Sequence, residues 1–408
     1  MIRVARKGAA VASVSLAVCL AAAACSSSSS SSTSSGSTGS ASAAAAVPQI
    51  SVSQLDRTFN AMASLKALAP AGKGSVAAIL PDTVTSARYT EFDAPYLSQA
   101  LALAGLSPSQ FSVQNAQGSD ATELSDAQEA ITKGASVLIM DPLDSGVGAQ
   151  IESYAKAHGV DVIDYDRLTL GGSRQYYVSF NNVEVGTLIG DGFVACATAW
   201  HVAKPNVLVM KGAPTDNNAT LFAQGYDAVL APHFSGGGYV SVGSAAGTWD
   251  PPTAESEFQQ QYTAHKNINS VLTPNDENAA PIIHYLQTLK VKPNTFPVTG
   301  QDATLVGLQN ILAGYQCGTV YKPIYLEAQA AVALAMYLRA SKTPPAALVN
   351  GQTKDSQSGT EVPSVLLKPT WVTTANMNST VIADQFVPAQ QLCVGSYVAA
   401  CKAAGISV

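Results

Sequence analysis

The sequence predicts an α/β fold in which parallel sheets are covered by helices on both faces. Two observations predict it: short apolar runs of four to six residues recur from Ser75 onward, and segments with apolar residues at helical spacing lie between them. Strand–helix–strand alternation of this kind gives parallel strands joined by right-handed crossovers. With 408 residues, 47% of them apolar, the chain is long enough for two domains.

Six runs are the predicted strands, because each is apolar and bounded by turn-forming or polar residues. In chain order they are 75–80 (SVAAIL), 137–140 (VLIM), 160–165 (VDVIDY), 207–210 (VLVM), 270–273 (SVLT) and 296–299 (FPVT). Helical spacing is clear between Val185 and Trp200 and in the Ala-rich stretch 325–339. A further amphipathic helix is expected over 52–68, before the first strand.

Charge and motifs exclude several functions. The formal net charge of −6 argues against a nucleic-acid partner, because phosphate binding needs a basic face. The five histidines are scattered and there is no H-E-x-x-H or C-x-x-C, so we expect no metal site. No G-x-G-x-x-G follows the first strand and no P-loop is present, so we expect no cofactor and no ATP hydrolysis by this chain.

The N-terminus is typical of an exported protein. Basic residues precede an apolar run that ends in LAAAAC, so residues 1–25 are expected to be a lipoprotein signal peptide whose Cys25 becomes lipidated; ordinary cleavage nearby is the alternative. The Ser-rich segment that follows can bury nothing, and we assign 26–49 as a tether. This predicts a globular part outside the cytoplasm, anchored to the cell membrane by lipid.

Four cysteines remain in the exported chain, which suggests two disulfides. Cys393 and Cys401 are close enough in sequence for a local loop, which leaves Cys196 with Cys317. Three pairings are possible in principle, so this assignment is a prediction.

Each predicted strand is followed by polar residues. They are, in chain order, Arg88-Tyr89, Asp141, Asp166-Arg167, Asp216-Asn217-Asn218, Asn275-Asp276 and Gln301-Asp302. The carboxyl ends of parallel strands line the crevice where ligands bind, although Asp and Asn at such places can also be simple helix N-caps. Carboxylates, amides and cations suit the hydroxyl groups of a neutral sugar, and Tyr89 and Trp249 can cover its apolar faces.

At these residues the sequence resembles the xylose-binding proteins of bacterial ABC importers, in the type I periplasmic-binding superfamily. The resemblance covers roughly 75–367 and rests on the runs SARY, YDRL, YYVSFNN, PTDNNATLF, PNDENAA, GQDATLVGLQNILAG and TVYKPI. It implies two lobes connected by three crossings, near 180–181, 320–322 and 362–366. Lobe 1 would comprise 50–180 and 321–362, and lobe 2 would comprise 181–320 and 363–408.

The resemblance also implies which residues contact the sugar. Those of matching type are Arg88, Tyr89, Asp166, Arg167, Asp216, Asn218, Trp249, Asn275, Asp302 and Lys322. Asn217 is expected to be structural. Tyr89 stands where a Trp is expected, which leaves the identity of the sugar open.

The expected function is therefore that of a monomeric solute-binding lipoprotein, which delivers xylose or a similar aldose to a permease whose ATPase is a separate subunit. A sugar sensor that presents its ligand to a membrane signalling partner is the alternative. A third possibility is a glycosidase, in which Asp216 and Asp302 would be the catalytic carboxylate pair. We expect no enzymatic activity.

Overall fold

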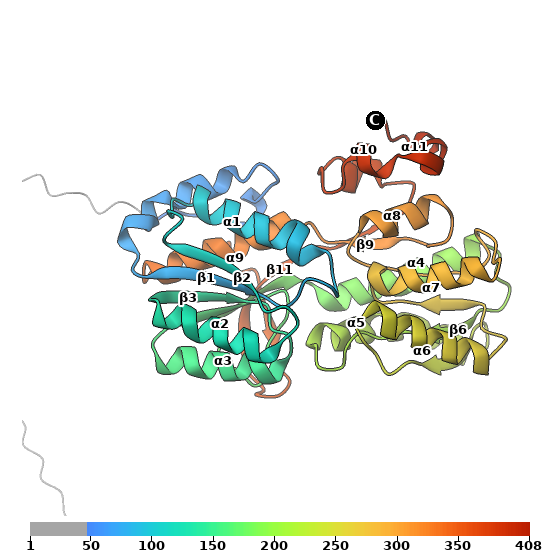
Figure 1. The fold of residues 1–408 in the computed structure, drawn as a ribbon, viewed down its shortest axis with the longest axis horizontal. Helices are drawn as coiled ribbons and strands as arrows, with labels where there is room; N and C mark the ends of the chain where they lie inside the picture. The colour runs from blue at the N-terminus through green and yellow to red at the C-terminus, as the bar shows by residue number, and fades with distance from the viewer. Residues whose placement is uncertain (1–46) are drawn as a thin grey trace, which may run out of the picture. The chain divides into compact units, whose positions relative to one another are not determined.

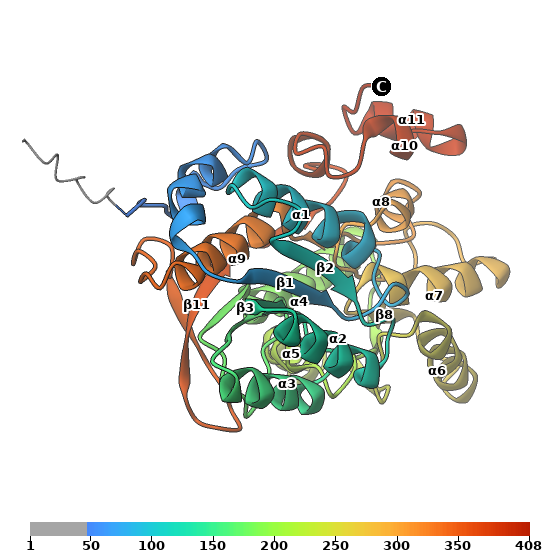
Figure 2. The ribbon, with the colours of Figure 1, turned by 60° about the vertical axis from the view of Figure 1, so that its left-hand side comes forward.

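The computed structural model describes residues 47–408, which form two α/β lobes lying side by side (Figures 1 and 2). The predicted signal sequence, the lipidation site Cys25 and the tether up to residue 46 lie outside the described residues. The predicted α/β architecture, with largely parallel sheets and flanking helices, is confirmed.

Lobe 1 is built on a seven-stranded sheet in the order β10-β11-β5-β4-β3-β1-β2, in which β10 is antiparallel to β11 and the other neighbours are parallel. Its strands are β1 (Ser75–Leu80), β2 (Phe111–Asn115), β3 (Ala135–Met140), β4 (Asp161–Tyr165), β5 (Tyr176–Phe180), β10 (Gly351–Lys354) and β11 (Glu361–Leu367). Its helices are α1 (Ala94–Leu103), α2 (Asp120–Thr132), α3 (Ser145–Ala157) and α9 (Ile324–Arg339).

Alternate residues of β1 pack on the two faces of this sheet. Val76, Ala78 and Leu80 belong to the core beneath α1 and α9, whereas Ala77 and Ile79 pack against α2 and α3. Figure 1 shows the two helix pairs on opposite sides of the strands. Because both faces are covered, the strands read as continuous apolar runs in the sequence.

The segment before β1 belongs to lobe 1. It forms two 3₁₀ helices, Val52–Gln54 and Asn60–Ala71, where the sequence predicted one amphipathic helix. The hydroxyl of Tyr337 in α9 donates to the Pro48 carbonyl at 2.5 Å, and Arg339 Nη1 donates to the Ala69 carbonyl at 2.8 Å. The end of the predicted tether is therefore already attached to lobe 1. The buried apolar side chains of this segment are Ile50, Leu55, Phe59, Met62, Leu65 and Leu68.

Lobe 2 has a smaller parallel sheet in the order β7-β6-β8. Its elements are α4 (Asn182–Ala199), β6 (Asn206–Val209), α5 (Asn217–Ser235), β7 (Val240–Ser244), α6 (Pro251–Ala264), β8 (Ser270–Leu272), α7 (Asp276–Thr288), α8 (Leu305–Leu312), β9 (Thr319–Tyr321), β12 (Thr370–Val372), α10 (Ala389–Leu392) and α11 (Val398–Ala403). The predicted strand 296–299 is present only as a parallel bridge between Val298 and Val271.

Helices α4 and α5 cover one face of this sheet and approach each other closely. A Cβ atom on Gly186 would lie 2.0 Å from the Phe222 carbonyl oxygen, so this contact requires glycine. Helices α6 and α7 cover the other face, around Phe258 and Ile282.

The chain crosses between the lobes after β5, after β9 and after β11. The first crossing follows Phe180 and the second follows Tyr321. The predicted third crossing at 362–366, and the boundary at 362/363, are wrong because Ser364–Leu367 pair in register with Tyr177–Phe180 of the lobe 1 sheet. Lobe 1 therefore extends to Leu367, and the chain re-enters lobe 2 at β12.

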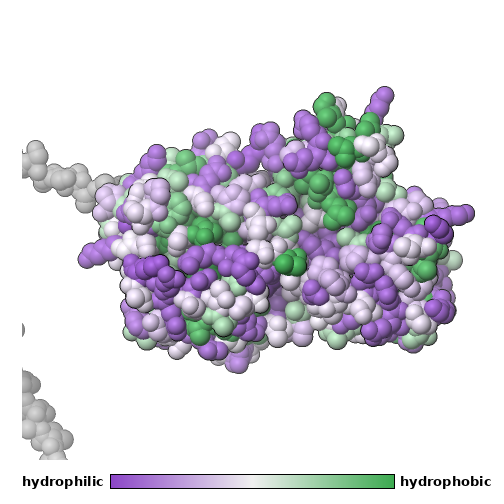
Figure 3. Space-filling view, in the orientation of Figure 1, coloured by the Kyte–Doolittle hydropathy of each residue, from purple (hydrophilic) through white to green (hydrophobic). Residues whose placement is uncertain are grey.

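Both disulfides join the cysteines paired in the sequence-based prediction. Cys196 in α4 is bonded to Cys317, just before β9, with Cα atoms 5.6 Å apart, and Cys393 is bonded to Cys401. The second bond ties together the C-terminal helices. Figure 3 shows hydrophobic residues over this segment, where the exposed apolar side chains are Val394, Val398 and Val408. In residues 47–408 no helix has the length and apolar character needed to cross a membrane.

Candidate functional site

Residues that follow the strands of both lobes line one cavity. All ten residues predicted from the sequence line it, namely Arg88, Tyr89, Asp166, Arg167, Asp216, Asn218, Trp249, Asn275, Asp302 and Lys322. The other lining residues are Thr85, Ser86, Phe222 and Gln301.

Arg88 lies on the lobe 1 side and is held from behind by carboxylates. Its Nε and Nη2 donate to Asp93 at 2.9 and 2.8 Å, Nη2 also donates to Glu327 at 2.7 Å, and Nη1 donates to Asp166 at 2.7 Å. A guanidinium has five N–H groups. One Nη1 hydrogen is therefore left without a bond to the described residues and is available to a ligand.

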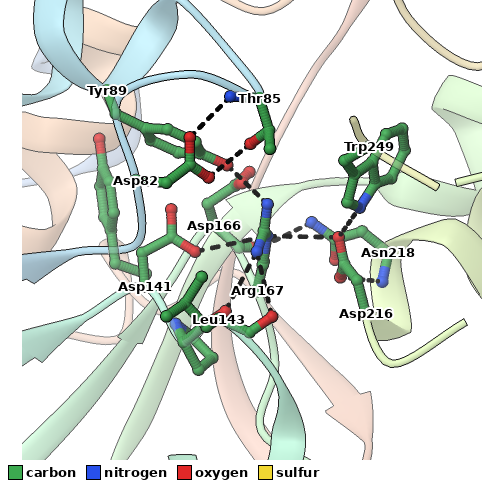
Figure 4. A network of polar contacts seen from close by, with 12 residues as sticks. Asp82, Thr85, Tyr89, Asp141, Leu143, Asp166, Arg167, Asp216, Asn218 and Trp249 are labelled. Atoms are coloured by element: carbon green, nitrogen blue, oxygen red, sulfur yellow. Dashed lines mark hydrogen bonds and ion pairs between the residues drawn. The ribbon is translucent and has the colours of Figure 1, made fainter. Parts of the chain in front are cut away.

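Arg167 and Tyr89 form the second part of the lobe 1 wall (Figure 4). Arg167 Nη2 donates to the Tyr89 hydroxyl at 2.8 Å, and the Arg167 guanidinium carbon lies 5.8 Å from the centre of the Tyr89 ring. Arg167 Nε lies 3.2 Å from Asp216 of lobe 2 and 3.6 Å from Asp141. Asp141, which also follows a predicted strand, is buried and is absent from the cavity lining.

On the lobe 2 side, polar groups lie where helices begin. Asp216 precedes α5 and accepts from the Asn218 amide at 2.8 Å with one oxygen, while the other accepts from Trp249 Nε1 at 3.0 Å. Asn275 precedes α7 and accepts from the Asn278 amide at 3.1 Å. The N-cap role and the cavity-lining position therefore occur together in the same side chains.

Lys322 lies at the second crossing and bridges the lobes. Its ammonium is 3.2 Å from Asp302 and 3.8 Å from Asp166. Asn218 of lobe 2 donates to the Asp166 carbonyl of lobe 1 at 3.0 Å. Direct polar contacts of this kind mean that the lobes are closed on each other in this structure.

Comparison with known proteins gives one consistent result. Residues 78–343 match the model of the periplasmic binding protein domain. The chain is 35% identical to the D-xylose-binding periplasmic protein of Escherichia coli over 277 residues, which is 67% of this chain and 80% of that protein. This chain belongs to the xylose-binding family of type I periplasmic binding proteins.

Two other similarities extend over more of this periplasmic binding protein. It is 29% identical to the multiple sugar-binding periplasmic receptor ChvE of Rhizobium radiobacter, over 79% of this chain and 93% of that protein. A carbohydrate transporter solute-binding protein from Chloroflexus aurantiacus in complex with D-glucose has a TM-score of 0.70 at 28% identity, and the match covers 78% of this chain and 98% of that one. Both relatives are sugar-binding proteins, and membership of this family makes the chain a solute-binding protein and not an enzyme.

Burial and charge act differently on the carboxylates of the site. Burial alone would raise the pKa of Asp166, but the neighbouring cations Arg88, Lys322 and Arg167 hold that pKa below its ordinary value. Burial raises the pKa of Asp216, although Arg167 opposes the change. Burial also raises the pKa of Asp141 well above its ordinary value. No cluster of His, Cys, Asp or Glu within residues 47–408 could hold a metal ion.

The buried carboxylates behind the cavity were not predicted from the sequence. Asp93 and Glu327 are fully buried and hold Arg88 in place. A signal for Glu327 was present, because it is a lone acidic residue in the apolar helix α9. Phe222 also had a signal, since it lies one helical turn after the predicted site residue Asn218.

Proposed function

We propose that this periplasmic binding protein binds xylose or a similar aldose in the cavity between its lobes and delivers it to the permease of an ABC importer. The observation that carries the proposal is the lining of that cavity: cations, carboxylates, amides and aromatic rings from both lobes surround one shared space. A sugar hydroxyl both donates and accepts hydrogen bonds, so it needs partners of both kinds.

The cavity lining offers both hydrogen-bond donors and hydrogen-bond acceptors to a sugar. Arg88, Arg167 and Lys322 would donate to ring and hydroxyl oxygens, and Asp216 and Asp302 would accept from hydroxyl groups. Hydrogen bonds that include a charged group are the stronger kind, about 1.5–3 kcal/mol each. The indole of Trp249, which is half-buried at the cavity, would cover the C–H face of the ring.

Binding would be coupled to closure of the lobes. Lobe 1 contributes Arg88 and Arg167, lobe 2 contributes Asp216 and Asn275, and Lys322 lies at a crossing between them. A ligand that contacts both lobes favours the closed arrangement over an open one. The permease would then recognise the closed form.

Calorimetry with a panel of sugars tests the proposal. Xylose, glucose, galactose, arabinose and ribose are titrated into the protein that has been stripped of ligand by unfolding and refolding. We expect at least one aldose to bind with a Kd of about 1 μM, which corresponds to about −8 kcal/mol. If none of the five binds more tightly than 1 mM (about −4 kcal/mol), the proposed ligand class is wrong.

We also propose that Cys25 carries the lipid that anchors the protein, on the basis of the LAAAAC run before it. Cell fractionation should place the wild-type protein with membranes and the Cys25→Ala variant in the soluble exported fraction. A wild-type protein that is released like the variant would show that the signal is cleaved in the ordinary way.

A further inference from the structure

Glu277 lies beside the cavity and reaches from lobe 2 to lobe 1. It is the second residue of α7, and its Oε1 accepts from the Ala87 backbone amide at 3.1 Å and from the Ser86 hydroxyl at 3.2 Å. It does not line the cavity, whereas Ser86 does. Glu277 therefore joins the two lobes without a place in the proposed sugar site.

The other carboxylate oxygen of Glu277 is tied to the site from the lobe 2 side. Its Oε2 accepts from Asn275 Nδ2 at 3.1 Å, and the Asn275 side chain lines the cavity. One carboxylate thus contacts a cavity-lining side chain from each lobe, Ser86 and Asn275. The contacts of the Glu277 carboxyl group therefore depend on how the two lobes are placed relative to each other.

The Ala87 amide is a suitable partner for a carboxylate. The Glu91 amide donates to the Ala87 carbonyl at 3.0 Å, so Ala87 lies at the start of the helical turn that leads into α1. The first amides of a helix have no partner within the helix and carry partial positive charge. Glu277 acts as a helix cap supplied by the opposite lobe, and an opened cleft would leave the Ala87 amide to water.

We infer that Glu277 is an interlobe latch, a positioning residue that stabilises the closed form without touching the ligand. The inference rests on the proposed sugar-binding function. A latch of this kind changes the equilibrium between open and closed lobes, and the apparent affinity for every ligand changes by the same factor. A residue that contacts the sugar would instead change the ratio of affinities between sugars.

The test compares Glu277→Ala with the wild type by calorimetry, using two aldoses that bind the wild type. We expect about a tenfold loss of affinity for each, since both hydrogen bonds from Glu277 to lobe 1 are lost, with the ratio between the sugars unchanged. Ser86→Ala removes one of the two bonds from the lobe 1 side and should give a smaller loss in the same direction. The matched control is Glu184→Ala in the first turn of α4, which should bind as the wild type does.

Small-angle scattering of the sugar-free protein gives a readout that does not need a ligand. Glu277→Ala should have a larger radius of gyration than the wild type, because its open form is more populated, and Glu184→Ala should not. Unchanged affinity and scattering, or a changed ratio between sugars, would overturn the latch. If the wild type binds no sugar, the proposed function fails, and the scattering comparison alone decides whether Glu277 holds the lobes together.

Discussion

The two lobes bring polar groups to the cavity in different ways. In lobe 1, Arg88 is held by two fully buried carboxylates: Asp93, five residues further along the chain, and Glu327, 239 residues away. In lobe 2, Asp216 and Asn275 precede helices and accept hydrogen bonds from the backbone of their own helix. The first arrangement depends on tertiary structure, and the second is mostly local.

The difference has an energetic consequence. Removal of one partner from a buried ion pair leaves an uncompensated charge and costs about 3–5 kcal/mol, whereas loss of an N-cap costs about 0.5–2 kcal/mol. Lobe 1 therefore offers rigid cations whose loss threatens the fold. In lobe 2 the neutral cap Asn275 can be changed with a small effect on stability, whereas Asp216 also pairs with the buried Arg167.

The largest effect is expected for Arg88→Met. Asp93 and Glu327 would lose the cation that pairs with them, and Asp166 would keep Lys322. The free energy of unfolding should therefore fall by about 3–5 kcal/mol, and sugar binding should be lost. Urea unfolding measures the first quantity and calorimetry the second.

Arg174→Met is the matched control for Arg88→Met. Arg174 is also a buried arginine of lobe 1 and lies 3.1 Å from Asp355, but it does not line the cavity. The Arg174→Met variant should lose stability to a similar extent as Arg88→Met, and its folded fraction should bind sugar with the wild-type affinity. Loss of affinity in both variants would show that stability alone limits binding.

The next largest effect is a loss of sugar affinity, expected when the aromatic side chain that lobe 2 places at the cavity is removed. Trp249→Ala removes the indole at the cavity and its bond to Asp216, and we expect a loss of affinity of about 2 kcal/mol, roughly 30-fold. Trp200→Phe, which lies outside the cavity lining, should bind as the wild type does. Equal affinity of Trp249→Ala and wild type would refute the stacking role.

The contrast between the lobes also explains how far the site could be predicted from sequence. Asp216 and Asn275 were found because each is among the first polar residues after an apolar run, and the ends of parallel strands meet at one edge of a sheet. The same rule pointed to Asp141, which lies behind Arg167 and outside the cavity lining. Position at a strand end therefore predicts proximity to the site and leaves the direction of the side chain open.

The contact between Glu327 and Arg88 could not be predicted in this way. Glu327 is 239 residues from Arg88 in the sequence and comes from α9, after the chain has passed through lobe 2 and returned. The third crossing was misplaced for a related reason, since β11 is recognised by its pairing with β5 and not by its own residues. Features that depend on long-range pairing have only a weak local signal.

A pH-dependent effect is expected from the buried carboxylates of lobe 1. Burial raises the pKa of Glu123 to about 8, although the Leu143 amide donates to it at 3.1 Å. Glutamate in an unfolded chain has a pKa of about 4.3, so the folded state retains a proton between these values. Stability should therefore fall as pH rises from about 4.5 to 8, by up to about 1.4 kcal/mol per pH unit for this group.

Glu123→Gln tests this dependence because its amide stays neutral. Urea unfolding between pH 5 and 8 should give a shallower decline than in the wild type. Glu361→Gln, an exposed position in β11, should leave the wild-type slope unchanged. Parallel curves for wild type and Glu123→Gln would show that Glu123 is ionised throughout this range.

The smallest change in affinity is expected at Asn275, whose side chain is both the N-cap of α7 and a proposed sugar contact. Asn275→Ser keeps a good N-cap for α7 but shortens the side chain at the cavity, so stability should be unchanged while affinity falls about twofold to tenfold. Ser119→Ala is the complementary change: Ser119 caps α2 with a 3.2 Å bond from the Thr122 amide and lies outside the cavity lining. The Ser119→Ala variant should lose about 1 kcal/mol of stability and bind sugar normally.

If Asn275→Ser instead loses stability and keeps its affinity, Asn275 serves only as a helix cap in the proposed site. The sugar contacts of lobe 2 must then be sought in Asp216 and Asp302.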